Sequence, residues 1–161
     1  MNEILGTLFA NLARLLGIAA VVGILYVVFA SNKTTDAITD TTQLQTNVQG
    51  LYSGQATFTS LTNAVAIAGK LAPKNMISGS NLVNPWGGAV TVRVNTTNAG
   101  RFDVVHAASI PQDACPKLVQ SQSSAVGVSI NGTAQTLPLD VGTATGACNV
   151  AENAVTFTFA H

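Results

Sequence analysis

Charged side chains are scarce in this chain of 161 residues, which carries seven basic and seven acidic side chains and no net charge at pH 7. A chain this neutral has no basic surface with which to neutralise phosphates, so we do not expect it to bind nucleic acid. After residue 31 the polar side chains are mainly those of Thr, Ser, Asn and Gln. Such a composition suits an exported protein whose surface must stay hydrated and still tolerate close neighbours.

The groups that enzymes and metal sites use are also few. Of the two histidines, His106 lies among apolar residues of an expected strand, and His161 is the last residue. Asp103 precedes His106 by three positions, so the two side chains point to opposite faces of that strand. The other acids lack the spacing of a calcium loop, and the cysteine pair lacks that of a zinc site. We therefore predict a non-enzyme without metal or cofactor, in which His106 is hydrogen-bonded or exposed rather than a general base.

Cysteine occurs only twice, at Cys115 and Cys148. An apolar N-terminal segment indicates export to an oxidising compartment, so the simplest interpretation is one disulfide between them. It would close a loop of roughly 34 residues and stabilise the fold by about 3–4 kcal/mol on the chain-entropy model. The alternative is a pair of buried free thiols.

Proline is absent before Pro73, and the chain begins with an apolar stretch, Ile4–Ala30. Its uninterrupted part, Leu15–Ala30, would span about 24 Å as a helix, and Arg14 can extend it toward the ~30 Å of a bilayer core. A signal peptide would begin with a basic segment and have a shorter apolar run, whereas this chain begins with an acid, Glu3. We predict a membrane helix with a cytoplasmic N-terminus. Its apolar core comprises Leu15, Leu16, Ile18, Val21, Val22, Ile24, Leu25, Val27, Val28 and Phe29.

The same helix is expected to continue beyond the apolar stretch as an amphipathic half. A narrow stripe at helical spacing ends near "GLYSG", where glycines favour a helix terminus. Its members are Ala37, Thr41, Leu44, Val48 and Leu51. We therefore predict an N-terminal helical domain over 1–52, apolar over about 4–30 and roughly 75 Å long. A Thr-rich helix needs a packing partner, which a head over 53–161 would supply.

Residues 53–161 are predicted to form a small α+β head. Helices are expected in "SLTNAVAIAGKLAP", with Ser60 as a cap, and over about a dozen residues of "IPQDACPKLVQSQ", with Pro111 in the first turn. Alternation predicts strands in "AVTVRV", "RFDVVHAA", "AVGVSI" and "NAVTFTFAH", each with one buried face. Turns are expected at "NPWGG", at "NTTNAG" and at Asn131–Gly132. The expected fold is an antiparallel sheet laid against the outer half of the long helix.

The order of these features resembles the type IV pilins, especially the type IVb class that includes toxin-coregulated pilin and the major pilins of conjugative thin pili. "NPWGGAVTV" is similar to the turn that enters the first strand of that class. "IPQDACPKLV" is similar to its cysteine-bearing helix, and "ACNVAENAVTFTFAH" to its cysteine followed by a terminal strand. The resemblance covers essentially the whole chain. It implies the type IV pilin fold, with a long N-terminal helix packed on a small antiparallel sheet head that holds one disulfide.

The resemblance also implies a role and partners. Pilins wait in the bacterial inner membrane until a prepilin peptidase, a platform protein and an assembly ATPase bring them into a helical homopolymer outside the cell. We expect a major structural subunit that serves adhesion, aggregation or conjugative contact, because a head with few charges can stack on copies of itself. The alternatives are a minor pilin or pseudopilin, and a membrane-anchored periplasmic binding module.

In this family a glutamate at the fifth mature position neutralises the N-terminal amine of a neighbouring subunit. Leu5 occupies that position here, the early acid is Glu3, and the amine would be that of Met1. Glu3 and Arg14 lie on nearly the same helix face about 16 Å apart, so they cannot touch within one straight helix. In parallel, staggered copies Glu3 of one subunit can approach Arg14 of another, and we predict that this pair sets their register. The alternative is an arginine that is solvated or paired with lipid phosphate.

Two further expectations follow from the resemblance. Pilins lose a leader before assembly, so we expect this sequence either to be already processed or to be processed differently. The kinking proline of the type IVa class is missing, and Gly17 and Gly23 are instead the expected places where the helix stretches or melts on assembly.

Overall fold

The computed structural model describes residues 32–161. By its internal contacts the chain divides into two compact units, 1–33 and 34–161. The first described helix, here called the stem helix, covers residues 32–51. The shorter helices are α2 (Asn63–Ala68), the 3-10 turn η1 (Lys74–Met76), α3 (Cys115–Ser121) and α4 (Val141–Ala147). The strands are β1 (Ile77–Ser78), β2 (Asn81–Val83), β3 (Ala89–Val94), β4 (Arg101–Pro111), β5 (Gly127–Ile130), β6 (Thr133–Gln135) and β7 (Glu152–Ala160).

The described strands form one antiparallel sheet in the order β1-β2-β3-β4-β7-β5-β6. The last element of the chain, β7, is therefore inserted in the interior of the sheet, where it pairs with both β4 and β5. The pairing of β4 with β7 changes register between His106 and Ile110, which marks a bulge in β4. Because β7 lies in the interior, the sheet cannot be completed until the C-terminal residues are in place.

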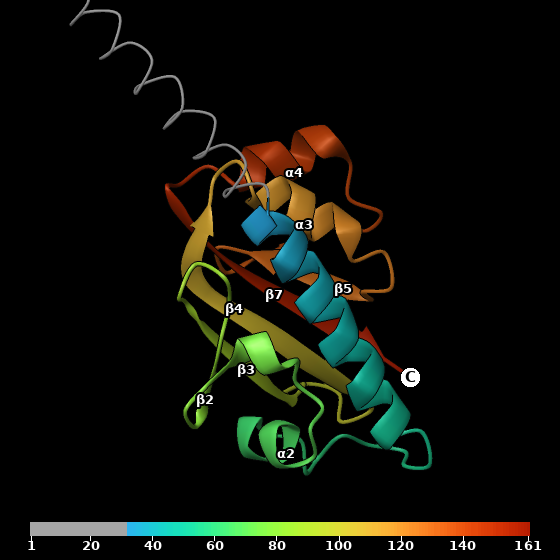
Figure 1. Cartoon of the computed structure of the whole chain (residues 1–161). Helices are drawn as coiled ribbons and strands as arrows, with labels where there is room; N and C mark the ends of the chain where they lie inside the picture. The colour runs from blue at the N-terminus through green and yellow to red at the C-terminus, as the bar shows by residue number, and fades with distance from the viewer. Residues whose placement is uncertain (1–31) are drawn as a thin grey trace, which may run out of the picture. The chain divides into compact units, whose positions relative to one another are not determined.

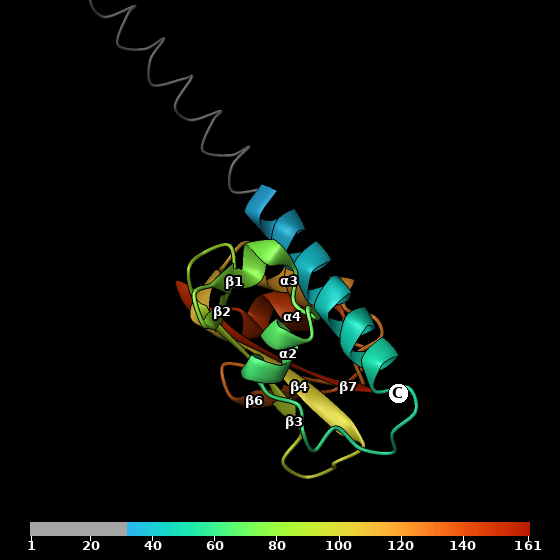
Figure 2. The same cartoon turned by 60° about the horizontal axis from the view of Figure 1, so that its bottom comes forward.

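The stem helix lies across one face of this sheet, and α3 lies beside it on the same side (Figure 1). In both views the stem helix ends close to the C-terminus of the chain (Figure 2). The side-chain amide of Gln49 donates to the carbonyl of Ala160 at this end. The ring of His161 also stacks on Phe58 with a centroid distance of 4.3 Å. The end of the stem helix and the segment that follows it are thereby joined to the C-terminus of the chain. The helices and the single antiparallel sheet confirm the predicted α+β class of the head.

The core forms where the stem helix meets the sheet, and most of the predicted stripe is confirmed. Thr41, Leu44 and Val48 are fully buried, and Ala37 is almost so. Leu51 was predicted to belong to this stripe, and that is wrong, because 54% of it is exposed while Tyr52 is 2% exposed. The helix ends at residue 51, and the next backbone N–H still bonds the carbonyl of Val48 at 3.0 Å. Tyr52 is therefore turned inward, toward Phe58 at a centroid distance of 5.2 Å.

The strands supply the other half of the core from alternate positions. The inward side chains are Val90, Val92, Phe102, Val104, His106, Val155, Phe157 and Phe159, all of them buried. The predicted strand faces and the hairpin turn at Asn131–Gly132 between β5 and β6 are thus confirmed. The turn at "NTTNAG" is confirmed as well, with the Asn95 N–H bonded to the carbonyl of Arg101 at 2.9 Å.

Two helix boundaries differ from the prediction. The cap of α2 is Thr62, whose hydroxyl accepts from the Val65 N–H at 3.2 Å, whereas Ser60 bonds the Tyr52 hydroxyl. Pro111 lies at the end of β4 opposite Glu152 rather than in a helix, because the strand continues through it. The helix α3 therefore begins at Cys115 and is only seven residues long.

Four short elements were not predicted: η1, β1, β2 and α4. The sequence of α4, "VGTATGA", contains two glycines and two threonines, which are poor helix formers. Asp140 supplies the start signal, since its carboxylate accepts from the backbone N–H groups of Gly142 and Thr143 at 2.8 and 3.0 Å. A bond from the Thr143 hydroxyl, together with these backbone bonds, lowers the pKa of Asp140.

The turn between β2 and β3 requires glycine at position 88. The side chain of Asn84 organises this turn by accepting from the N–H of Gly88 at 2.9 Å and donating to the Ser109 hydroxyl at 2.8 Å. A β-carbon on Gly88 would lie 1.9 Å from the oxygen of Ser109. We expect Gly88→Ala to lower the free energy of unfolding by roughly 1–3 kcal/mol, as overpacking does.

Urea denaturation of the purified chain measures this loss, and Gly146→Ala is the matched control. A β-carbon on Gly146 would meet nothing within 4 Å, and the residue lies in α4. Alanine there should be neutral or stabilise by up to about 1 kcal/mol. Equal effects of the two substitutions would contradict the steric role of position 88.

Candidate functional site: the seam between the stem helix and the head

Most of the residues predicted to act in assembly lie outside the described residues 32–161 and stay predictions. They are Met1, Glu3, Arg14, Gly17, Gly23 and the ten apolar residues between positions 15 and 29. The division into domains 1–52 and 53–161 also stays a prediction. Within residues 32–161, no helix is both long enough and apolar enough to cross a membrane.

The predicted disulfide is confirmed. Cys115 and Cys148 are bonded, with their Cα atoms 5.9 Å apart and a sequence separation of 33, and neither is exposed. Cys115 opens α3, and Cys148 caps the end of α4 just before β7. The bond therefore fixes two short helices to each other at the entrance to the interior strand.

We call the contact between the stem helix and the rest of the head the seam. At its centre the hydroxyl of Thr41 and Nε2 of His106 share a hydrogen bond at 3.2 Å. His106 is 1% exposed, and its ring makes a T-shaped contact with that of Phe157 at a centroid distance of 6.1 Å. Burial lowers the pKa of His106 from 6.5 to about 4, so the ring is neutral at pH 7. His106 is thus a hydrogen-bonded structural histidine, as predicted.

A second polar contact closes the seam beside this one. Asn75 of η1 donates its side-chain amide to both carboxylate oxygens of Asp40, at 2.7 and 2.8 Å. Burial raises the pKa of the Asp40 carboxyl, the bond from Asn75 opposes this, and the neighbouring charge of Asp36 adds to the rise. Asp40 is only 4% exposed, so this bond satisfies a carboxylate that would otherwise be costly to bury.

The seam extends to the segment around the end of α3. The amide of Gln122 donates to the carbonyl of Ile38 at 3.4 Å and to the hydroxyl of Thr42 at 3.2 Å. The hydroxyl of Ser124 donates to the side-chain carbonyl of Gln45 at 3.0 Å. Uncharged side chains thus fix the rotation and axial position of the stem helix on the head.

The outward side of the stem helix is uncharged between residues 37 and 51, where its exposed residues are Thr, Gln, Gly and Leu. The hydroxyls of Thr42 and Thr46 bond backwards to the carbonyls of Ile38 and Thr42, at 2.8 and 2.9 Å. Hydroxyls satisfied by their own helix cost little to remove from water. This side of the stem helix is therefore suited to contact with another protein surface.

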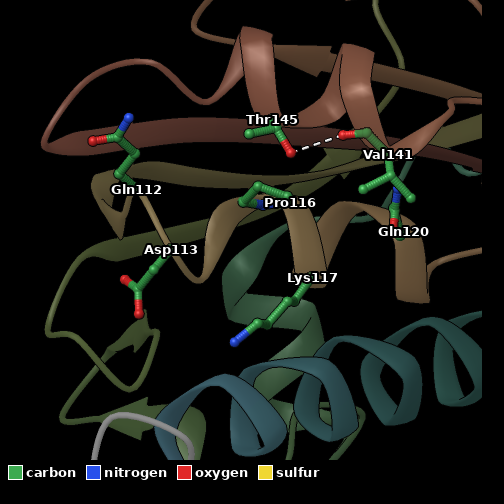
Figure 3. Close-up of a pocket in the computed structure, with 7 residues that line it drawn as sticks. All are labelled: Gln112, Asp113, Pro116, Lys117, Gln120, Val141 and Thr145. Atoms are coloured by element: carbon green, nitrogen blue, oxygen red, sulfur yellow. Dashed lines mark hydrogen bonds between the residues drawn. The ribbon is translucent and has the colours of Figure 1, made fainter. Parts of the chain in front are cut away.

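A hollow of about 550 Å³ lies between α3 and α4 (Figure 3). It is lined by Gln112, Asp113, Pro116, Lys117, Gln120, Val141 and Thr145. Val141 is 66% exposed, so the hollow offers an apolar wall beside neutral amides. Within residues 32–161, no three His, Cys, Asp or Glu side chains are placed to hold a metal ion, here or elsewhere.

The partners within the seam could not be predicted, although signals for some members were present. Thr41 interrupts an apolar stripe, and His106 continues the inward face of Phe102 and Val104. Polar residues at such core positions indicate a buried hydrogen bond. The pairing itself joins residues 65 positions apart and depends on the packing of the helix on the sheet. Asp40 carried no signal, because acids adjacent to a stripe are ordinarily exposed.

A helix laid on an antiparallel sheet, with the C-terminal strand in its interior and one disulfide, is the fold of the type IV pilins. The crystal structure of a type IVb pilin from Salmonella typhi matches it with a TM-score of 0.61 and 23% sequence identity, over 78% of this chain and 98% of that chain. The family model described as PilS N terminal matches residues 31–160. The chain belongs to this family, and its fold is that of a type IVb-like pilin. None of the curated proteins is significantly similar to the chain.

Membership of this family gives the chain a structural rather than an enzymatic role. It implies a subunit that polymerises with copies of itself into a pilus outside the cell.

Proposed function

We propose that this chain is the major structural subunit of a type IVb-like pilus. The observation that carries the proposal is the family match, which spans nearly all of the described residues. In this proposal the N-terminal apolar helices form the filament core and the heads form its outer surface. The chain waits in the inner membrane, and the assembly ATPase, platform protein and prepilin peptidase act on it before polymerisation.

Two properties of the head support the role of a repeated subunit. The chain has no net charge, so many copies can stack without long-range repulsion. The outward side of the stem helix is uncharged between residues 37 and 51, and two of its hydroxyls are already bonded to its own backbone. Dehydrating such a surface against a neighbour costs little. A filament of this kind would serve adhesion, aggregation or conjugative contact.

Labelling along sheared filaments tests whether the chain is the major subunit. A short epitope inserted at Thr97 is suitable, because this residue is exposed in the loop between β3 and β4. The C-terminus is less suitable, since His161 stacks on Phe58. We expect immunogold particles along the whole length of each filament, and no filaments in a strain that lacks the chain.

The pattern of label separates the proposal from its alternatives. Label confined to filament ends would indicate a minor pilin. Abundant chain in the inner membrane without labelled filaments would indicate an anchored binding module. Either pattern would overturn the proposed role, provided that the untagged chain restores wild-type filaments in the same strain.

A further inference from the structure

The His106 ring is buried under the stem helix without full hydrogen bonding. Its Nε2 is paired with Thr41, but its Nδ1 has no partner. Among residues 32–161 this Nδ1 is the single buried side-chain nitrogen or oxygen without a partner. A buried polar atom without a hydrogen-bond partner lowers stability, so the closed seam is less stable than it would be if Nδ1 were bonded.

Within residues 32–161, no charged group compensates a proton on this ring. Its strand neighbours in register are Val90 on β3 and Val155 on β7. The charged residues of the elements around it are Lys33, Asp36 and Asp40 on the stem helix, Lys74 on η1, Arg93 on β3, Arg101 and Asp103 on β4, Lys117 on α3, and Glu152 on β7. All of these are exposed except Asp40 and Asp103. Asp103 lies on the opposite face of the sheet, and Asp40 is bonded to Asn75.

Removal of the stem helix is the least disruptive way to hydrate the ring. The stem helix meets the head through side chains, whereas β4 is joined to β3 and β7 by backbone ladders. The disulfide holds α3, α4 and the entrance to β7 together independently of the seam. Local openings of this kind occur in folded proteins well below the free energy of global unfolding.

We propose that His106 makes the seam an acid-sensitive fastening, in which protonation of the imidazole releases the stem helix while the disulfide-linked sheet stays folded. The direction of this pH dependence follows from the difference between the pKa of the ring in the closed seam and in the open one. An exposed histidine binds a proton near pH 6.5, and burial lowers the pKa of His106 to about 4. The closed seam is therefore fully stable above pH 6.5 and loses stability as the pH falls from 6.5 toward 4.

Asp40 has the opposite pH dependence. Burial raises the pKa of its carboxyl, so the closed seam binds that proton more readily than the open one. Protonation of Asp40 at low pH would therefore favour closure. The acid sensitivity assigned to His106 must appear in spite of this effect, and the two residues can be separated by substitution.

Hydrogen–deuterium exchange of the full chain in detergent micelles, with the disulfide intact, tests the proposal. For peptides over 37–48, protection corrected for intrinsic rates should fall about 30-fold between pH 7.5 and pH 5. Peptides from β4 and β7 should keep their protection. His106→Gln keeps an amide that can reach Thr41 and has no proton to gain, so its stem-helix protection should not depend on pH. Asp40→Asn is the control that should retain the acid sensitivity.

Exchange at the imidazole carbon of His106 gives a readout on the wild-type chain, which holds even if His106→Gln does not fold. We expect slow exchange at pH 7 and a titration midpoint between about 4, the pKa of the buried ring, and 6.5, the pKa of an exposed one. A midpoint near 6.5, equal acid sensitivity of His106→Gln and wild type, or simultaneous loss of protection in the stem helix and β7 would each overturn the proposal. None of these measurements requires filaments, so the result is independent of the proposed pilus role.

Discussion

Loss of the disulfide is expected to lower the free energy of unfolding of the head by roughly 3–4 kcal/mol. Cys115 and Cys148 enclose a loop with a sequence separation of 33, and opening this loop enlarges the ensemble of unfolded chains. The double substitution Cys115→Ala/Cys148→Ala is the suitable variant. Both positions are fully buried, and serine there would add hydroxyl groups without partners.

Urea unfolding of the wild type and the double variant, each with and without reductant, isolates the contribution of the bond. Reductant should destabilise the wild type by an amount similar to the double substitution and should leave the double variant unchanged. An effect of reductant on the variant would show that something other than this bond responds, because the described residues contain no free cysteine. A wild type that reductant leaves unchanged would show that the bond contributes little.

The position of the disulfide predicts which elements lose stability first when it is broken. α3 and α4 pack on each other, and the bond fixes the end of α4 immediately before β7 enters the sheet. β7 pairs with both β4 and β5. If the start of β7 is no longer held in place, its hydrogen bonds to both neighbouring strands weaken. The stem helix, which contacts the head through the seam, depends on the bond only indirectly.

The parts of the fold that the sequence predicts correctly are those fixed by local pattern. Alternation identifies β3, β4 and β7 because each has one buried face. The stem helix is correct as far as Val48 because its stripe repeats at helical spacing. The prediction that Leu51 is buried was wrong because it extended the apolar stripe to the last residue of the helix. Tyr52 is buried because the helix ends just before it, which the helical spacing of the stripe does not indicate.

The parts that were missed depend on contacts distant in sequence. β1 and β2 are two and three residues long and exist because they pair with each other and with β3. α4 is poor in helix formers and is held by the Asp140 cap and by the disulfide. The seam joins Thr41 to His106 and Asp40 to Asn75, and neither pair has a sequence spacing that marks it. Tertiary packing creates these contacts, so no local pattern could predict them.

Reversal of either charge of the predicted Glu3–Arg14 pair is expected to abolish surface filaments, and reversal of both is expected to restore them. These residues lie outside the described part of the chain, and the expectation rests on the proposed parallel packing of N-terminal helices. Glu3→Arg and Arg14→Glu each place like charges together in the filament core. A buried charge without its partner costs several kcal/mol, which corresponds to more than about a hundredfold in an assembly constant.

Filament yield by shearing, with membrane fractionation of the same cells, separates assembly from insertion. Each single variant should remain in the inner membrane and yield no filaments, and Glu3→Arg/Arg14→Glu should recover a substantial share of the wild-type yield. Lys70→Glu is a matched control, because it reverses an exposed charge on the head and should leave the yield unchanged. Normal piliation of either single variant would exclude the pair as a register device, and Arg14 would then act only as a membrane boundary. Failure of the double variant with a correctly inserted chain would show that each charge has its own partner, Glu3 the N-terminal amine and Arg14 lipid phosphate.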